Sequence, residues 1–218
     1  MIIIFYDDEY MKIDVEKKWI DLCQRLGVSK EIALQTFQQI IDTYSFPLRA
    51  YHSLQGHIAS GLLVLEEIRL LGIAKNFNAL QFAWFCHDAI YDPQSKDNER
   101  RSAEFAAELI GDMGLSPLFS KAVKDLIIVT HRPIIPENKD ECLIIDLDHL
   151  NFGWEHSLFS QQTKNIRQEL SFLSDDDFSL NTEKLFTKML KKNSIFLTPY
   201  FKERYEQKAQ SNLQRALL

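Results

Sequence analysis

The stretch of residues 82–91 places an imidazole and a carboxylate side by side, at His87 and Asp88, among apolar residues. A segment this hydrophobic belongs in a protein core, where an ionised carboxylate without a partner is costly in free energy. The fold must therefore bring a compensating group to this segment from elsewhere in the chain. A metal ion is the partner that uses both side chains at once, because imidazole nitrogen and carboxylate oxygen are both metal ligands.

Helical spacing of apolar residues dominates the rest of the chain. Ser29, for example, follows one amphipathic segment at 13–26 and is placed to cap a second helix at 30–44. Glycine and proline are scarce, with 7 and 6 residues, which favours long helices over a turn-rich β fold. The sequence predicts an all-α bundle of about nine helices, with His87 and Asp88 inside a helix at 78–91. Residues 1–12 are compatible with a short strand, a disordered start or a cap.

The length of 218 residues suits one domain with a sizeable core. The sequence contains no internal repeat, low-complexity segment or obvious linker. We therefore expect a single all-α domain over residues 1–218. Within it, the core that carries the site spans about 45–150, and the helices of about 151–218 pack on that core.

Charge and cysteine content limit the classes of partner. The net charge of −6 argues against nonspecific binding to nucleic-acid polymers or anionic membranes. Cys23, Cys86 and Cys142 lack the spacing of a disulfide framework or zinc site, so we interpret them as packing residues in a reducing compartment. No stretch reads as a signal peptide or is long enough to span a membrane. These features predict a cytoplasmic protein.

Two further segments supply histidine and aspartate residues, R-A-Y-H-S-L-Q-G-H at 49–57 and I-I-D-L-D-H-L at 144–150. With W-F-C-H-D-A-I-Y-D at 84–92, D-N-E-R-R-S-A at 97–103 and T-H at 130–131, they give the order His, His-Asp, Asp. This set resembles the HD superfamily of metal-dependent phosphohydrolases, and most closely a branch of small bacterial predicted HD phosphohydrolases. The resemblance runs from about residue 45 to the C-terminus.

The resemblance implies that His52, His87, Asp88 and Asp148 bind a divalent metal ion. Asp146 competes with Asp148, because residues two apart lie on different faces of a helix. Asp148 fits the family pattern better, which would leave Asp146 to orient a histidine. Two imidazoles and two carboxylates suit Mn²⁺, Fe²⁺, Co²⁺ or Ni²⁺ in octahedral coordination. Mg²⁺, which prefers oxygen ligands, and Zn²⁺, which is usually tetrahedral, are alternatives.

The implied activity is that of an enzyme, a metal-dependent phosphohydrolase in which metal-activated water attacks phosphorus. Asp92 follows Asp88 by four residues on the expected helix and is a candidate general acid. Glu99, at the start of the next helix, is a second candidate for a catalytic or supporting acid. Either carboxylate could instead serve only at a helix end. Alarmone-hydrolysing relatives read H-D-x-x-E-D, and Tyr91 replaces the first of these acids, which argues against alarmone hydrolysis.

Four basic residues are candidates for contact with the substrate. His57 could contact the substrate, support the site or be a buried polar residue, and His131 could bind phosphate or a second metal ion. Arg49 and Arg132 could clamp a phosphate, since guanidinium forms paired hydrogen bonds to oxyanions, or could be surface charges.

The expected partner is a small phosphorylated molecule, a nucleotide if the resemblance holds, and a homodimer through the charged C-terminal helices is compatible with the sequence. One alternative function is a non-catalytic helical module that binds metal and nucleotide. Another is an interaction scaffold in which the same histidines and aspartates form a buried polar network.

Overall fold

The computed structural model describes residues 2–6, 9–45, 49–131 and 134–218. Its contacts divide the chain into two compact units, Met1–Ile144 and Ile145–Leu218. The division lies inside helix α7, Lys139–Asp148, close to the position near residue 150 that the sequence suggests. That the whole chain acts as one domain stays a prediction.

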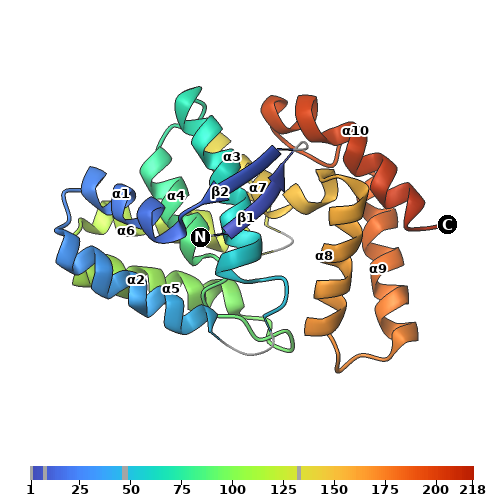
Figure 1. The fold of residues 1–218 in the computed structure, drawn as a ribbon, viewed down its shortest axis with the longest axis horizontal. Helices are drawn as coiled ribbons and strands as arrows, with labels where there is room; N and C mark the ends of the chain where they lie inside the picture. Colours follow the sequence, from blue (N-terminus) through green and yellow to red (C-terminus); the bar gives the residue numbers. More distant parts are fainter. Residues whose placement is uncertain (1, 7–8, 46–48, 132–133) are drawn as a thin grey trace. The chain divides into compact units, whose positions relative to one another are not determined.

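The prediction of an all-α fold is confirmed, with ten α-helices in the described residues (Figure 1). The N-terminal segment adds an antiparallel hairpin of two strands, β1 (Ile2–Tyr6) and β2 (Glu9–Ile13), paired in register from Ile2 with Ile13 to Tyr6 with Glu9. The other elements of the first unit are α1 (Val15–Arg25), α2 (Lys30–Tyr44), the π-helix η1 (Leu54–Ile58), α3 (Ala59–Leu70), α4 (Phe77–Cys86), α5 (Asn98–Asp112) and α6 (Pro117–Ile128).

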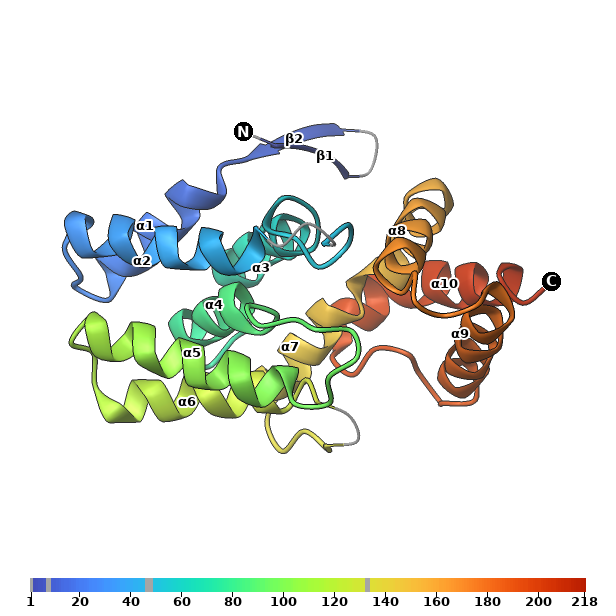
Figure 2. The ribbon, with the colours of Figure 1, turned by 90° about the horizontal axis from the view of Figure 1, so that it is seen from below.

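Helix α4 is the buried centre of the first unit. It packs against α1, α3, α5 and α6, and Figure 2 shows it between α3 and the pair formed by α5 and α6. Its side chains from Ala79 to Cys86 are all buried. A helix that is apolar on every side is stable only when neighbours cover it all round. The residues that directly follow α4, including His87 and Asp88, are therefore delivered from the core rather than from the surface.

Gly61 on α3 lets α4 approach closely. A Cβ atom at this position would lie 2.2 Å from Cζ2 of Trp84. Because Gly61 has no side chain, the buried indole packs against α3 and donates from Nε1 to the carbonyl oxygen of Ile58 at 2.9 Å. The glycine therefore fixes the position of Trp84, which itself contacts the histidines described below.

We expect Gly61→Ala to lower the free energy of unfolding by about 2 kcal/mol or more, since overpacking must displace Trp84. Gly111→Ala is the matched control, because Gly111 is an exposed residue of α5 and an added Cβ there meets open space. The control should gain about 0.5–1 kcal/mol from the better helix propensity of alanine. Urea unfolding followed by circular dichroism measures both, and equal stability of the two variants would contradict the packing role of Gly61.

The second unit contains the end of α7, the 3₁₀ turn η2 (Leu150–Gly153), α8 (His156–Glu169), α9 (Asp175–Leu190) and α10 (Pro199–Arg215). Helix α10 contacts η2, α8 and α9. Asn212 on α10 donates to the carbonyl oxygens of Phe152 and Trp154 at 2.9 and 2.8 Å and faces Nδ1 of His156 at 3.0 Å. One buried amide thus ties α10 to η2 and to the start of α8.

Asp146 anchors the start of α10. Its two carboxylate oxygens accept from the backbone N–H of Leu197 at 2.7 Å, and from the N–H and hydroxyl of Thr198 at 2.8 and 2.7 Å. Burial raises the pKa of the Asp146 carboxyl to about 6, although these hydrogen bonds act in the opposite direction. Both oxygens of Asp146 are thus used by the N-terminal end of α10, and a role for Asp146 in orienting a histidine ligand stays a prediction.

Asp146→Ala should cost about 3 kcal/mol of stability, because two backbone N–H groups and a hydroxyl lose their acceptor at a buried position. Asp175→Ala is the control in the same unit. Its carboxylate pairs with Arg167 at 2.8 Å but is 92% exposed, so the change should be below about 0.5 kcal/mol. Chemical unfolding of the full chain tests the pair, and a small loss for Asp146→Ala would refute its anchoring role.

Candidate metal centre

His87 and Asp88 lie in a turn directly after α4, not inside a helix. The helix ends at Cys86, and His87 is its C-terminal cap, whose N–H donates to the carbonyl oxygen of Ala83. The predicted helix at 78–91 is therefore wrong in its last part. In a turn the two side chains are not held at the angular spacing of a helix, so both can face the same point.

The ring of His87 is fixed by its surroundings. It is 1% exposed, it stacks on Trp84 with ring centroids 4.5 Å apart, and its Nδ1 lies 2.9 Å from the Trp84 carbonyl oxygen. A carbonyl oxygen can only accept, so Nδ1 carries the proton of the neutral ring and Nε2 carries the lone pair. An imidazole whose Nδ1–H is held by a carbonyl is the usual form of a histidine that binds metal through Nε2.

Three candidate ligand atoms converge at this point within the first unit. Nε2 of His87 lies 3.3 Å from Nε2 of His57 and 3.0 Å from Oδ2 of Asp88, and Nε2 of His57 lies 3.7 Å from the same oxygen. A metal about 2.1 Å from each ligand sets neighbouring ligands about 3.0 Å apart in an octahedral shell and about 3.4 Å apart in a tetrahedral one. The three separations span these values.

The donor set fits a divalent cation. Oδ2 of Asp88 is buried and, among the described residues, has no geometrically defined hydrogen-bond partner, although Nε2 of His87 lies 3.0 Å away. Two imidazole nitrogens and one carboxylate oxygen that face one another repel unless a cation or a proton lies between them. His57, His87 and Asp88 could therefore hold a metal ion.

The charge state of Asp88 agrees with this environment. Burial alone would raise the pKa of its carboxyl, but the imidazoles of His87 and His52 outweigh burial and hold that pKa well below the usual range. Asp88 is therefore an anion at neutral pH, which is the form that binds a metal ion.

His57 occupies the place that the sequence assigns to His52. His57 is 5% exposed and belongs to η1, in which Ser53 caps the N–H of Gly56 at 3.1 Å. π-Helical turns occur frequently at functional sites. His52 lies outside the ligand group, and its ring packs on Tyr91 with centroids 4.2 Å apart. The candidate group thus contains His57 where the predicted ligand set has His52, and the predicted contact of His57 with substrate stays a prediction.

Arg49 holds the turn that carries the pair. Its guanidinium donates to the carbonyl oxygens of Asp88 and Ala89, both at 2.7 Å, and lies over the ring of Tyr44 at 4.6 Å. Tyr44 in turn donates to the carbonyl oxygen of Phe85 at 3.1 Å. Arg49 therefore supports this turn through both of its terminal nitrogens, and its role as a phosphate clamp stays a prediction.

The first turns of α5 hold the other side of the same loop. Ser102 donates to the carbonyl oxygen of Ile90 and accepts from its N–H, and Asn98 does the same for Asp92. The carboxylate of Asp92 is exposed and accepts from the N–H of Gln94 at 2.9 Å. Asp92 therefore shapes a turn, and the reason for placing it beside Asp88 on one helix face does not apply.

Glu99 and His131, which belong to the separate motifs at 97–103 and 130–131, are in contact. Nδ1 of His131 lies 3.1 Å from Oε2 of Glu99, and the side chains are 43% and 29% exposed. Arg132, the other predicted phosphate clamp, lies outside the described residues.

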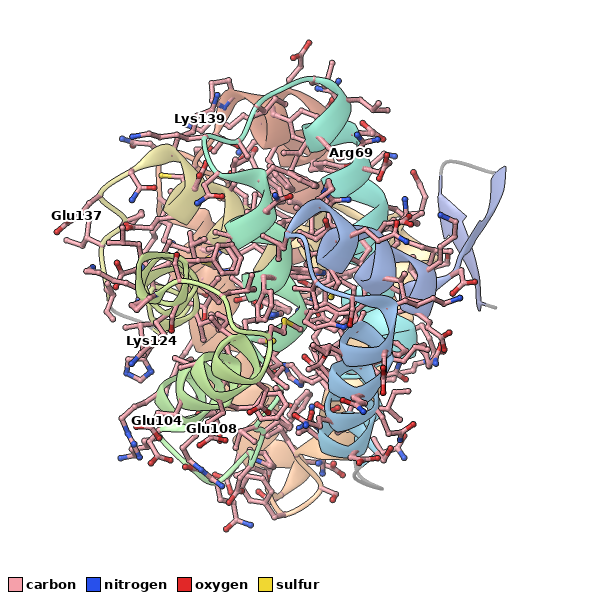
Figure 3. The ribbon with its side chains drawn as sticks, turned by 90° about the vertical axis from the view of Figure 1, so that its left-hand side faces the viewer. Arg69, Glu104, Glu108, Lys124, Glu137 and Lys139 are labelled. Carbon is pink, nitrogen blue, oxygen red and sulfur yellow. The ribbon has the colours of Figure 1, made fainter. Side chains whose placement is uncertain are left out.

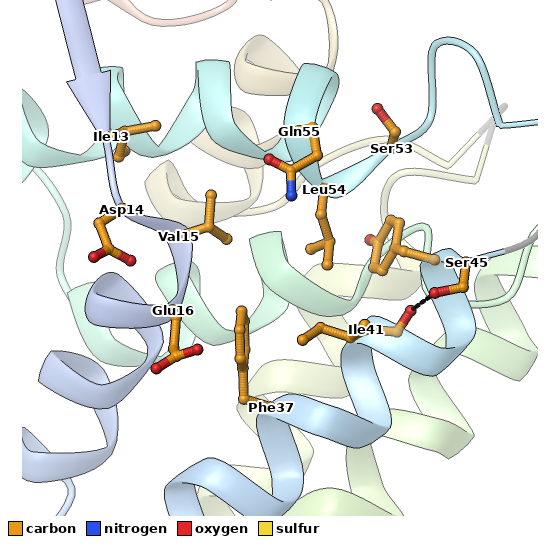
Figure 4. A pocket seen from close by; sticks show the side chains of 11 residues that line it. Ile13, Asp14, Val15, Glu16, Phe37, Ile41, Ser45, Ser53, Leu54 and Gln55 are labelled. Carbon is orange, nitrogen blue, oxygen red and sulfur yellow. Dashed lines mark hydrogen bonds between the residues drawn. The ribbon is translucent and has the colours of Figure 1, made fainter. Parts of the chain in front are cut away.

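A hollow of about 380 Å³ lies beside η1 (Figure 4). Val15, Phe37 and Leu54 give it apolar walls, and the carboxylates of Asp14 and Glu16 also line it. Two carboxylates repel a phosphate, so this hollow is unsuited to a phosphorylated substrate.

Comparisons of the sequence with protein-family models, curated proteins and solved structures give no match. Among the described residues, no helix has both the length and the apolar character needed to cross a membrane. The motifs and the geometry of His57, His87 and Asp88 are therefore the features that bear on function.

Proposed function

We propose that this protein is a metal-dependent phosphohydrolase that acts on a small phosphorylated molecule. The observation that carries the proposal is the convergence of Nε2 of His57, Nε2 of His87 and Oδ2 of Asp88 within 3.0–3.7 Å. A divalent ion supplies Lewis acidity, because it polarises a phosphoryl oxygen and lowers the pKa of bound water. The resemblance of the motifs to HD phosphohydrolases adds the reaction class.

We propose Asp148 as the fourth ligand. It is the last residue of α7, is partly exposed, and is the aspartate that fits the motif pattern better than Asp146 does. Asp146, the competing carboxylate, already accepts three hydrogen bonds from residues 197 and 198. A set of two imidazoles and two carboxylates favours Mn²⁺, Fe²⁺, Co²⁺ or Ni²⁺ over Mg²⁺, which prefers oxygen ligands.

Residues around the candidate site hold its side chains and its backbone in place. Trp84 and its carbonyl fix the ring of His87, while Arg49 and Ser102 hold the loop after Asp88 from two sides. His52 and Tyr91 present partly exposed rings next to these supports, with centroids 4.2 Å apart and planes tilted by 30°. Aromatic rings of this kind suit contact with a nucleobase, which supports a nucleotide as substrate.

A second candidate function is a module that binds metal and nucleotide without turnover. It is favoured by the exposed carboxylate of Asp92, which accepts from the N–H of Gln94 in a turn, and by Tyr91, which stands where alarmone-hydrolysing HD proteins have an acid. Both candidates require metal, and only the first requires phosphate release.

Elemental analysis of protein purified without a histidine tag, together with phosphate release from nucleotides and simple phosphoesters in Mn²⁺, tests the proposal. The hydrolase predicts about one metal ion per chain and release of phosphate. Metal without release from any member of the panel would favour the binding module. Absence of metal, with no gain in thermal stability from Mn²⁺ or Ni²⁺, would refute both functions.

A further inference from the structure

The pair formed by Glu99 and His131 has the geometry of a proton-transfer dyad. The carboxylate engages Nδ1 of the imidazole at 3.1 Å, so Nε2 is the ring nitrogen that can reach a ligand. A carboxylate in this position selects the Nδ1–H tautomer and fixes the orientation of the ring. With 43% of the His131 side chain exposed, a ligand can reach the ring.

The dyad is tied to the loop that follows Asp88. Glu99 lies between Asn98 and Ser102 in the sequence. The Asn98 side chain forms hydrogen bonds with the backbone of Asp92, and the Ser102 side chain forms them with the backbone of Ile90. Ile90 is two residues from Asp88, which spans at most about 7 Å of chain, and Glu99 is one helical turn from Ser102. The same two turns of α5 therefore position both the metal-binding turn and the carboxylate that orients His131.

We infer that His131 is the proton donor to the leaving group and that Glu99 is its positioning residue. This inference rests on the proposed function and narrows the substrate to phosphoesters with a basic leaving group, such as an alkoxide. The attacking water forms the new O–P bond and loses a proton to solvent, while the P–O bond to the leaving group breaks. The leaving oxygen takes the Nε2 proton of the imidazolium, the neutral ring keeps its Nδ1 proton toward Glu99, and solvent restores the Nε2 proton.

The first test compares phenyl phosphate with p-nitrophenyl phosphate in Mn²⁺, because only the more basic phenolate needs a proton donor. His131→Gln should slow phenyl phosphate hydrolysis by about 100-fold or more and p-nitrophenyl phosphate by less than about 10-fold. Glu99→Gln should give the same pattern with a smaller loss. Glu104→Gln is the control, since Glu104 is an exposed residue of the same helix (Figure 3) that pairs with Arg100 at 2.7 Å; its rates should equal those of the wild type.

Equal slowing of both esters in His131→Gln, or no slowing, would overturn the dyad and leave the proposed function standing. A wild-type protein that hydrolyses neither ester nor any member of the nucleotide panel would overturn the proposed function itself. The second measurement is independent of activity. Nitrogen-15 NMR of the imidazoles should find the neutral ring of His131 as the Nδ1–H tautomer in the wild type and as the Nε2–H tautomer in Glu99→Gln, and the same tautomer in both proteins would overturn the positioning role.

Discussion

Asp88→Asn should abolish metal binding without destabilising the metal-free protein. Asparagine keeps the shape of the side chain but removes the negative charge, so the site loses its anionic ligand. Its amide can donate to Nε2 of His87, whereas in the wild type Oδ2 faces that nitrogen at 3.0 Å. Metal content should fall from about one ion per chain to below detection, and phosphate release should fall with it by about 1000-fold or more.

Thermal unfolding with and without Mn²⁺ separates this prediction from a simple loss of structure. Wild-type protein should melt at a higher temperature in Mn²⁺, and Asp88→Asn should show no shift while its metal-free midpoint equals or exceeds that of the wild type. Asp125→Asn is the control, because Asp125 is exposed on α6 and pairs with Lys121. An Asp88→Asn protein that still gains stability from Mn²⁺ would contradict the assignment of Asp88 as a ligand.

The fold class followed from the sequence because helical periodicity and buried apolar segments are local properties. The end of α4 did not, since the apolar residues continue to Tyr91 and no breaker precedes Pro93. The helix stops at Cys86, and the carbonyls beyond it bind Arg49 and Ser102, which are distant in sequence. A hydrophobic pattern does not distinguish a buried helix from a buried turn, and only tertiary contacts decide between them.

The histidine and aspartate motifs contain the residues of the candidate metal group, but their spacing did not assign a separate role to each residue. Asp146 could not be separated from Asp148 by spacing, because its partners, Leu197 and Thr198, carry no motif of their own. The convergence of Glu99 and His131 was equally invisible, although each was singled out separately. The sequence thus indicated which histidine, aspartate and glutamate residues are candidates, whereas their individual contacts depend on residues distant in sequence.

His57 and His52 lie five residues apart in one motif. The apolar residues that follow His57 distinguish the two histidines. His57 directly precedes Ile58 and Ala59, the fully buried residues at the start of α3, and so enters the core. His52 is only partly buried, and its ring packs on Tyr91. A metal that is held by His87 in the core should therefore bind the more buried histidine.

His57→Gln should weaken Mn²⁺ binding by about 100-fold or more, because loss of a ligand should exceed the 10–100-fold effect typical of residues that only support one. His52→Gln is the matched change in the same segment and should weaken binding by less than about 10-fold, since His52 lies outside the candidate ligand group. Calorimetric titration of both variants with Mn²⁺, after circular dichroism has verified their folds, measures the difference. The reverse order of affinities would return the ligand role to His52 and would leave the 3.3 Å contact of His57 with His87 as a hydrogen bond that shares one proton between the rings.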